Sequence, residues 1–449
     1  MRPAHASGRD VALAVVRDVF PPPGSRAVER SAQGALDYRA RKAGLSDRDT
    51  AFAAELAYGA IKMRRTLDWY LAAALRDARN DDENGPLGSR GVIREILRLA
   101  LYELAYTRPD EHATVFEFVN LAKRYGHRGL GNLVNAVLRN FLRQRPQPPA
   151  RDRFAGDEEF LATRYSLPTW IVRQWRELFG ERSEAMFAGV NEPAAAAVVV
   201  NARKIEPSQA LEQLRAAGAQ ARPSRFVAES VVTDRARDND GCWWPQSESS
   251  AMVVDVLLPQ PGETILDLCS GRGNKALQIG ARLGGEGSLT CVERNPAKVA
   301  ALQRRLAAAE LSAAIVTGDA TADLLPGQQF DRVLVDAPCS GVGIIGRHPE
   351  ARWKKQRSDG ERLAVTQRAL LERAARHVHR GGVLVYAVCS TDPRETTEVV
   401  EGFLAHENFE RGLIPAAYEA HLTDANDVLI VPGIEGRDGF YIARLERRL

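Results

Sequence analysis

The sequence contains few cysteines and no pattern that would join them. None of the five belongs to a CxxC pair, and none has a histidine partner at the spacing of a zinc site, so we predict no metal site. An odd number of cysteines without such spacing indicates reduced thiols in a cytosolic protein, where a conspicuous cysteine can be a nucleophile. The five are Cys242, Cys269, Cys291, Cys339 and Cys389.

Hydrophobic segments of the kind that membranes or secretion require are also lacking. No apolar run is long enough to span a bilayer, and the N-terminal "MRPAHASGRD" has no hydrophobic stretch after its charges, unlike a secretory signal. The 449 residues, 45% of them hydrophobic and 27% charged, are too many for one ordinary core. We expect a soluble, cytoplasmic protein of two or three domains with no membrane partner.

Charge is distributed unevenly along the chain. Residues 1–150 carry 24 Lys and Arg against 17 Asp and Glu, a net charge of +7, and the remainder carries −4. A basic first third indicates an anionic partner such as nucleic acid. Solvated helix faces would account for the same charge equally well, so both interpretations stay open on charge alone.

Residues 1–148 are predicted to form an all-α bundle, because apolar residues recur at helical spacing and no strand-like alternation occurs. Ser46 and Asp49 form a start signal similar to a capping box. We interpret 77–90 as a loop and 143–152 as a linker. The helical segments are "RDVALAVVRDVF", "DTAFAAELAYGAIKMRRTLDWYLAAAL", "GVIREILRLALYELAY", "TVFEFVNLAKRYG" and "LGNLVNAVLRNFLRQ".

Two α/β regions follow the bundle. Residues 149–240 contain short helices and two strand-like runs, "AAVVVNA" and "ESVVTD", which predict a small α/β linker domain. In 241–449, β-branched-rich strands alternate with helices, which predicts a doubly wound, Rossmann-like parallel sheet. The last two runs, "DVLIVPG" and "GFYIARLE", are suited to a terminal hairpin on that sheet.

Ligands bind such sheets beyond the carboxyl ends of the strands, where the strand order reverses. The first strand runs into a glycine-rich turn, "CSGRGNKA", where missing Cβ atoms let a ligand approach backbone N–H groups. The turn also fits the dinucleotide fingerprint G-x-G-x-x-A, so a dehydrogenase is an alternative. Glu293 ends the second strand at the spacing of a ribose-binding acid, and Asp319 ends the third. Together they indicate a pocket for an adenosine-containing ligand, although either acid alone could simply cap a helix.

The fourth and fifth strands deliver two thiols. "DRVLVDAPCS" ends with Asp336 and Cys339, "GGVLVYAVCS" ends with Cys389, and the two strands should be neighbours. A thiolate that adds to C6 of a cytosine activates C5 for methylation, after which a second group must remove the C5 proton. Asp336 is placed to stabilise charge near N3 and the amine. Two buried core cysteines are the alternative, which the Ser- and Gly-rich turns after each strand disfavour.

"DAPCSGVGIIGRHPEARW" and "LVYAVCSTDPRE" resemble the Sun family of RNA cytosine-5 methyltransferases, which use S-adenosyl-L-methionine. The helical segments "SDRDTAFAAELAYGAIKMRRTLDWYL", "LRLALYELAY" and "NLVNAVLRN" resemble the NusB-type RNA-binding domain. The combination is similar to bacterial 16S ribosomal RNA methyltransferases of the RsmB/Sun type. This resemblance implies methyl transfer to C5 of cytosine 967 of 16S RNA, in an unassembled or partly assembled small subunit, by a monomer.

The resemblance also assigns residues. Cys389 corresponds to the family's nucleophile, Cys339 to the cysteine that assists product release, and Asp336 lies close to the target base. The implied cofactor-binding positions are Cys269, Ser270, Gly271, Arg272, Gly273, Asn274, Lys275, Glu293, Asp319 and Asp336.

The sequence departs from the family pattern in three places: the first loop, Glu293 and Thr396. Arg272 replaces a Pro and Asn274 a Gly in the first loop, and Glu293 stands where Asp is common. Thr396 replaces the Asn of the family's Pro-x-Glu-Asn, so a role for that Asn is not supported. A second hypothesis, an RNA-binding protein with a decayed catalytic domain, is disfavoured by the intact acids and thiols. Phosphate contacts are expected from basic bundle residues that include Lys123, Arg124, Arg128, Arg139 and Arg143.

Overall fold

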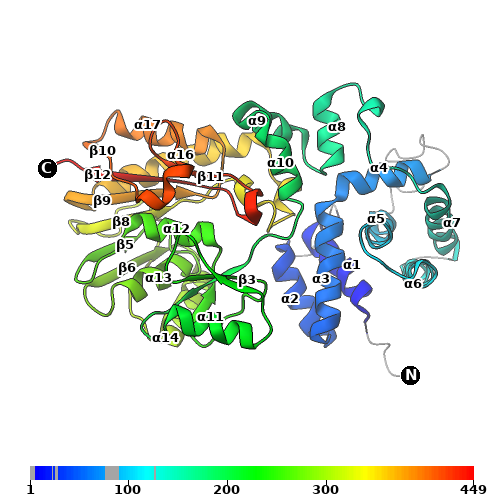
Figure 1. Ribbon diagram of the computed structural model, residues 1–449, viewed down its shortest axis with the longest axis horizontal. Coiled ribbons are helices and arrows are strands. Elements are labelled where there is room, and N and C mark those ends of the chain that lie inside the picture. Colours follow the sequence, from blue (N-terminus) through cyan, green and yellow to red (C-terminus); the bar gives the residue numbers. More distant parts are fainter. Residues whose placement is uncertain (1–5, 23, 26–28, 76–90, 126–127) are drawn as a thin grey trace. The chain divides into compact units, whose positions relative to one another are not determined.

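The computed structural model describes residues 6–22, 24–25, 29–75, 91–125 and 128–449. The chain forms two compact units: unit 1 contains Met1–Phe187 and His348–Lys354, and unit 2 contains Ala188–Arg347 and Lys355–Leu449 (Figure 1). The loop expected at 77–90 lies outside the described residues. Within them, no helix is both long and apolar enough to cross a membrane, and no cluster of three metal-ligating side chains occurs.

Unit 1 is helical, as the sequence predicts, and its core is formed by the apolar faces of its first seven helices. Ser46 caps one of them by accepting a hydrogen bond from the Asp49 amide. The segment 49–75 is helical as predicted, and it is divided into two helices at Met63, whose ψ of 15° ends one helix and begins the next. The helices are α1 (Gly8–Val19), α2 (Ala32–Ala43), α3 (Asp47–Lys62), α4 (Arg64–Ala74), α5 (Gly91–Tyr106), α6 (Glu111–Arg124), α7 (Arg128–Gln144), α8 (Asp157–Arg164), α9 (Thr169–Phe179) and α10 (Arg182–Gly189).

A short segment from the second half of the sequence completes unit 1. It contains α15 (Ala351–Lys354), and Arg352 on this helix is fully buried. The Arg352 guanidinium donates hydrogen bonds to the carbonyls of Lys62 and Ser166, at 3.3 and 3.2 Å, and Trp353 Nε1 donates to the Ile61 carbonyl at 2.7 Å. Burial lowers the pKa of Arg352 to about 9. The composition of "RHPEARW" gave no sign that it would pack among these helices.

Unit 2 begins with a small antiparallel sheet whose strand order is β2-β3-β1-β4. The strands are β1 (Ala197–Val200), β2 (Ala221–Pro223), β3 (Ser230–Thr233) and β4 (Trp243–Pro245), and α11 (Pro207–Ala216) packs on them. The two strands expected in this region are present. β4 comes from beyond residue 240 and pairs with β1.

The larger sheet of unit 2 has the order β10-β12-β9-β8-β5-β6-β7, with β11 paired to β12. Its central strands are parallel, and the C-terminal strands β10, β11 and β12 join antiparallel, so the expected terminal hairpin is present. The strands are β5 (Thr264–Asp267), β6 (Ser288–Glu293), β7 (Ala314–Thr317), β8 (Phe330–Asp336), β9 (Val378–Val388), β10 (Phe409–Arg411), β11 (Val428–Ile430) and β12 (Phe440–Arg447).

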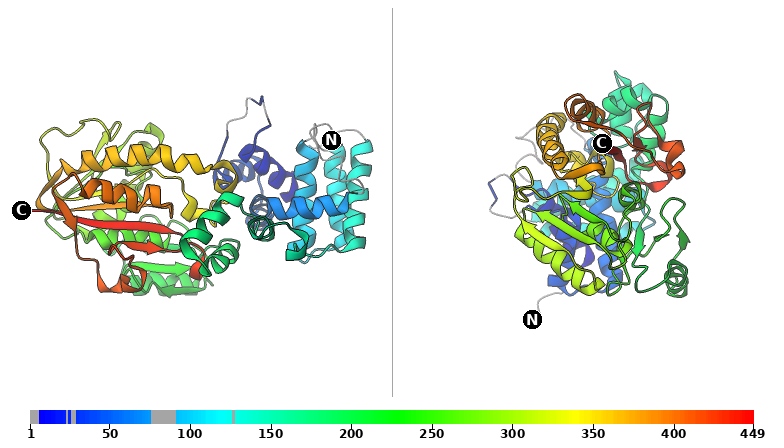
Figure 2. Two further views of the ribbon diagram at one scale, coloured as in Figure 1. Left: turned by 90° about the horizontal axis from the view of Figure 1, so that it is seen from above. Right: turned by 90° about the vertical axis from the view of Figure 1, so that its left-hand side faces the viewer.

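Helices cover both faces of this sheet (Figures 1 and 2). One core layer contains side chains of α12 (Glu248–Leu257), α13 (Asn274–Arg282) and α14 (Pro296–Ala309), and the other contains those of α16 (Arg357–Ala375) and α17 (Thr397–Leu404). β5 lies between β6 and β8, so the strand order reverses there. The doubly wound architecture predicted from the sequence is confirmed, with an antiparallel extension.

Candidate active site

A cavity of about 560 Å³ opens at the carboxyl ends of the parallel strands, beside the point where their order reverses. This volume is in the range of small-molecule and cofactor sites. Five of the predicted cofactor-binding residues line it: Cys269, Gly271, Glu293, Asp319 and Asp336. The other five predicted cofactor-binding residues are not among the described residues that line it: Ser270, Arg272, Gly273, Asn274 and Lys275. Sequence reasoning missed the wall that α16 provides, which consists of Val365, Thr366, Ala369 and Leu370.

The glycine-rich turn after β5 is held in shape by its neighbours. Gly273 has φ +90°, and a Cβ on it would lie 2.3 Å from Leu302 Cδ1, so the position requires glycine. Asn274 begins α13, and its side-chain amide donates to the Pro245 carbonyl at 3.2 Å. Arg305 donates to Asn274 Oδ1 and, at 2.9 Å, to the Arg272 carbonyl. The Asn274 side chain and the Arg272 carbonyl therefore help to hold the turn in place, whereas the Arg272 side chain is exposed.

The two acids after β6 and β7 each bind the backbone of their own turn as well as lining the cavity. Glu293 Oε1 accepts from the Asn295 amide at 2.7 Å. Asp319 Oδ1 accepts from the Thr321 amide and hydroxyl at 3.0 and 2.8 Å, and these hydrogen bonds lower the pKa of Asp319. Both of the roles considered for these acids, capping a turn and facing a ligand, are compatible with this geometry.

Lys275 points to Asp336 rather than into the cavity. Its Nζ lies 2.6 Å from Asp336 Oδ2 and 5.3 Å from the centre of the Phe440 ring. Lys275 is buried, whereas about a third of the Asp336 side chain is exposed. Behind this pair lies Asp267, whose pKa is raised to about 7 by burial and by the neighbouring charge of Asp336. Sequence reasoning missed both the ion pair and the buried Asp267.

The two predicted thiols meet, because β8 and β9 are parallel neighbours in register at their ends. Cys339 Sγ lies 3.1 Å from Cys389 Sγ, within hydrogen-bonding distance for thiols, and neither residue is fully buried. The hydrogen bond with Cys389, burial, and the charges of Cys389, Glu395 and Asp336 all raise the pKa of Cys339. Cys339 therefore holds its proton, and the pair carries at most one negative charge.

The comparisons with known proteins divide the chain in three. The model described as "16S rRNA methyltransferase RsmB/F" matches residues 254–446, the NusB family model matches 7–143, and an RsmF/B-like ferredoxin-like domain model matches 167–239.

Two relatives span almost the whole chain. The ribosomal RNA small subunit methyltransferase B of Thermus thermophilus is 35% identical, with 93% of each chain covered. The probable enzyme of the same name from Bacillus subtilis is 30% identical over 90% of this chain and 92% of that one.

Solved structures share the fold at lower identity. The crystal structure of PH0851 covers 98% of both chains with a TM-score of 0.81 and 22% identity. The structure of NSun6 from Pyrococcus horikoshii with SFG covers 62% of this chain and 98% of that one, with a TM-score of 0.56 and 17% identity. These likenesses bear on the fold alone.

Proposed function

The chain belongs to the family of 16S ribosomal RNA methyltransferases B, and from this premise we propose that it methylates C5 of a cytosine, cytosine 967, through a covalent bond between Cys389 and C6. The observation that carries the proposal is the thiol pair 3.1 Å apart near Asp336, which lines the cavity. The family assignment favours a methyltransferase over the dehydrogenase that the glycine turn alone would permit.

The residues around the cavity fit S-adenosyl-L-methionine as the cofactor. When bound, this cofactor supplies a methyl group on a positively charged sulfur. Glu293 and Asp319 can accept from the hydroxyls and the amine of an adenosine, Cys269 and Gly271 line the cavity beside them, and the apolar side of α16 can cover an adenine ring. We assign the cofactor's binding to these residues together with Asp336.

The proposed reaction begins with attack by the Cys389 sulfur on C6. The thiolate is the nucleophilic form of cysteine. When Cys389 is the thiolate, the Cys339 thiol is the donor of the hydrogen bond between them and so stabilises the negative charge on Cys389. As the C6–S bond forms, the electron pair of the C5–C6 double bond moves onto C5 and N3, and C5 would then take up the methyl group that the cofactor supplies. Asp336, oriented by Lys275, faces the N3 and amine edge of the base, where its carboxylate can accept a hydrogen bond from the amine.

Release of the product depends on Cys339. Once Cys389 is bonded to C6 it no longer carries a negative charge, so a principal cause of the raised pKa of Cys339 is removed. Cys339 then loses its proton to solvent and accepts the proton from C5. As the C5–H bond breaks, its electron pair restores the ring double bond and the C6–S bond breaks, which returns Cys389 as a thiolate.

The test uses Cys389→Ala, with Cys242→Ala as a control cysteine outside the site. Methyl transfer to 16S RNA should be lost in the first variant and retained in the second. Bisulfite mapping of RNA from cells with and without the protein identifies the position modified. Methylation by Cys389→Ala at a near wild-type rate would refute the proposal.

We also propose that unit 1 binds the RNA. Its exposed Tyr38 has three cations near its ring centre: Arg30 at 4.5 Å, Arg39 at 5.5 Å and Lys42 at 5.9 Å. Exposed aromatic rings among basic side chains are typical of surfaces that bind single-stranded RNA. Of the basic residues expected to contact phosphate, Lys123, Arg124, Arg139 and Arg143 are described, whereas the Arg128 side chain lies outside the described part. Charge reversal at these positions should lower the salt dependence of RNA binding.

We also propose the domain bounds of the protein, its location and oligomeric state, and the form of its RNA substrate. The domains are taken as 1–148, 149–240 and 241–449. The enzyme acts in the cytoplasm as a monomer. Its substrate is 16S RNA in an unassembled or partly assembled small subunit, so methylation of naked 16S RNA should exceed methylation of complete subunits.

A further inference from the structure

A buried carboxylate joins the two cysteine loops. Glu395 ends the short helix η4 (Pro393–Glu395) and is fully buried. Its Oε1 accepts from the Ser340 amide at 2.8 Å, and its Oε2 accepts from the hydroxyls of Ser340 and Ser390, the latter at 2.6 Å. Ser340 directly follows Cys339 and Ser390 directly follows Cys389, so one side chain holds the residue next to each thiol.

The same carboxylate is also connected to α16. Gln367 donates from Nε2 to Glu395 Oε1 at 3.1 Å and to the Pro338 carbonyl at 3.0 Å. The Tyr386 hydroxyl donates to the Glu395 carbonyl at 2.7 Å. Glu395 thereby contacts the Cys339 loop, the Cys389 loop and the helix that lines the cavity.

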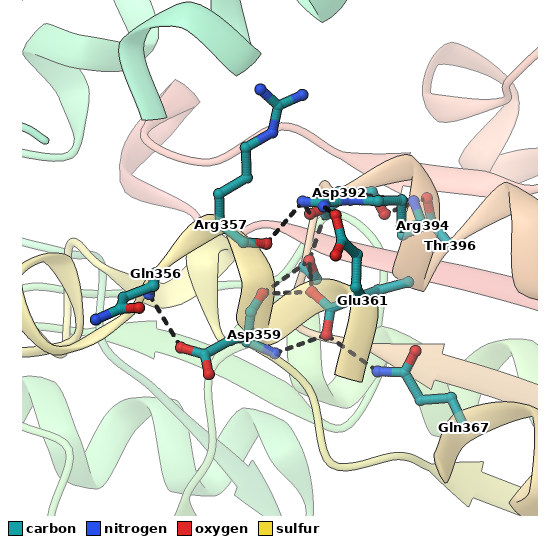
Figure 3. A network of polar contacts seen from close by, with 11 residues as sticks. Gln356, Arg357, Asp359, Glu361, Gln367, Asp392, Arg394 and Thr396 are labelled. Carbon is teal, nitrogen blue, oxygen red and sulfur yellow. Dashed lines mark hydrogen bonds and ion pairs between the residues drawn. The ribbon is translucent and has the colours of Figure 1, made fainter. Parts of the chain in front are cut away.

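The backbone around Glu395 is fixed by a second set of contacts (Figure 3). Asp392 accepts from the amide and the guanidinium of Arg394, and Arg394 also donates to Glu361 at 2.6 Å and to the Arg357 carbonyl at 2.9 Å. α16 can come this close because residue 360 is glycine: a Cβ there would lie 2.7 Å from Asp392 Oδ2. The position of Glu395 is therefore set before any substrate binds.

The negative charge of Glu395 is balanced by hydrogen bonds alone. Among the ion pairs between described residues, none involves Glu395, although its neighbour Arg394 makes two. A buried carboxylate without a cation is costly, and a neutral side chain could have filled the same space. Packing alone therefore does not explain why residue 395 carries a negative charge.

We propose that Glu395 is a positioning residue for methyl transfer, which holds the two thiols at reacting distance and keeps the resting proton on Cys339. This inference rests on the proposed roles of Cys339 and Cys389. Besides Glu395, the titratable groups near Cys339 are Tyr386 on β9, Cys389 directly after β9, and Asp336 on β8, the last paired with Lys275 of α13.

Removing the charge while keeping the shape should change both properties. In Glu395→Gln, the amide has one acceptor oxygen instead of two, so the serine hydroxyls must reorient and the loops lose their fixed spacing. We expect kcat on the high-pH plateau to fall about tenfold, equivalent to about 1.4 kcal/mol, with the KM values for cofactor and RNA unchanged. The ascending limb of the kcat profile should shift to lower pH, because a negative charge near Cys339 has been removed.

Glu398→Gln is the matched control. Glu398 lies on α17, three residues after Glu395, and its side chain is exposed, so the same loss of charge there should leave kcat and the pH profile as in the wild type. Thermal unfolding of each variant shows whether it is folded. As a second variant, Ser340→Ala removes the hydroxyl that donates to Glu395 and keeps the negative charge of Glu395. It should lower kcat about fivefold, which corresponds to the loss of one ordinary hydrogen bond, without shifting the pH range over which kcat rises.

The outcomes separate the inference from the proposed function. A Glu395→Gln enzyme with kcat within twofold of the wild type refutes the positioning role, and so does a lower kcat with an unmoved pH profile. Both results leave the covalent mechanism intact as long as Cys389→Ala is inactive. Activity in Cys389→Ala would instead remove the premise on which both rest.

Discussion

The ion pair between Lys275 and Asp336 allows a quantitative prediction for Asp336→Asn. Breaking a buried pair by removing one partner costs about 3–5 kcal/mol, because the other charge is left uncompensated. Lys275 is buried but about a third of the Asp336 side chain is exposed, so water can screen the remaining ammonium group in part. We therefore expect a destabilisation of about 2 kcal/mol, below the range for a fully buried pair.

Scanning calorimetry with and without the cofactor measures this effect. The transition that rises in temperature when cofactor is added belongs to unit 2, because all the lining residues of the cavity lie in that unit. For a unit of this size, a loss of about 2 kcal/mol lowers Tm by roughly 4–8 °C. The double variant Asp336→Asn with Lys275→Met should recover most of the loss, since no buried charge is left unpaired.

An exposed ion pair provides the control. Asp323→Asn removes the partner of Arg373, 3.3 Å away, but more than half of the Asp323 side chain is exposed. Its removal should lower Tm by at most about 4 °C, because surface pairs contribute about 0–1 kcal/mol. If Asp336→Asn and Asp323→Asn change Tm equally, then Lys275 has another source of compensation and the reasoning fails.

Three other predictions concern the site. Cys339→Ala should accumulate a covalent RNA adduct through Cys389, seen as a gel shift that survives denaturation, and an adduct that forms only when Cys339 is present would reverse the two roles. Gly273→Ala should destabilise unit 2 by about 2–4 kcal/mol in calorimetry, because strain at positive φ adds to the clash with Leu302; a change under 0.5 kcal/mol would contradict this. Asp267 binds its proton more tightly in the folded protein than in the unfolded chain, so its contribution to stability is lost as pH rises from about 4 to about 7. Over that range Asp267→Asn should become more stable relative to the wild type, and parallel curves of stability against pH for the two proteins would contradict this.

Much of the site could be predicted because its residues follow strands directly. In a parallel sheet the residue after each strand reaches the same edge, so Asp319, Asp336 and Cys389 could be placed from the sequence without any contact information. The neighbouring positions of β8 and β9, and with them the thiol pair, follow from the doubly wound order.

Residues that act across the chain could not be found in this way. Glu395 is one acid in a charged stretch, and its role depends on the hydroxyls of Ser340, 55 residues away, and of Ser390. The break at Met63 leaves no trace in the helical periodicity, because both helices bury an apolar face on the same core. Nothing in the sequence around Val365 indicates a binding site, and this residue lines the cavity only because of the path that α16 takes.

The division of the chain into units has a practical consequence for dissecting the enzyme. The backbone passes from unit 1 to unit 2 after Phe187, returns at His348 and leaves again after Lys354, so no single cut separates the two. A fragment that starts at residue 241 would carry Arg352 and Trp353 without the carbonyls of Ile61, Lys62 and Ser166 that accept their hydrogen bonds. A buried arginine and a partly buried tryptophan, 13 and 14 residues after Cys339, would then be exposed, and such a fragment should aggregate unless this short segment is also replaced.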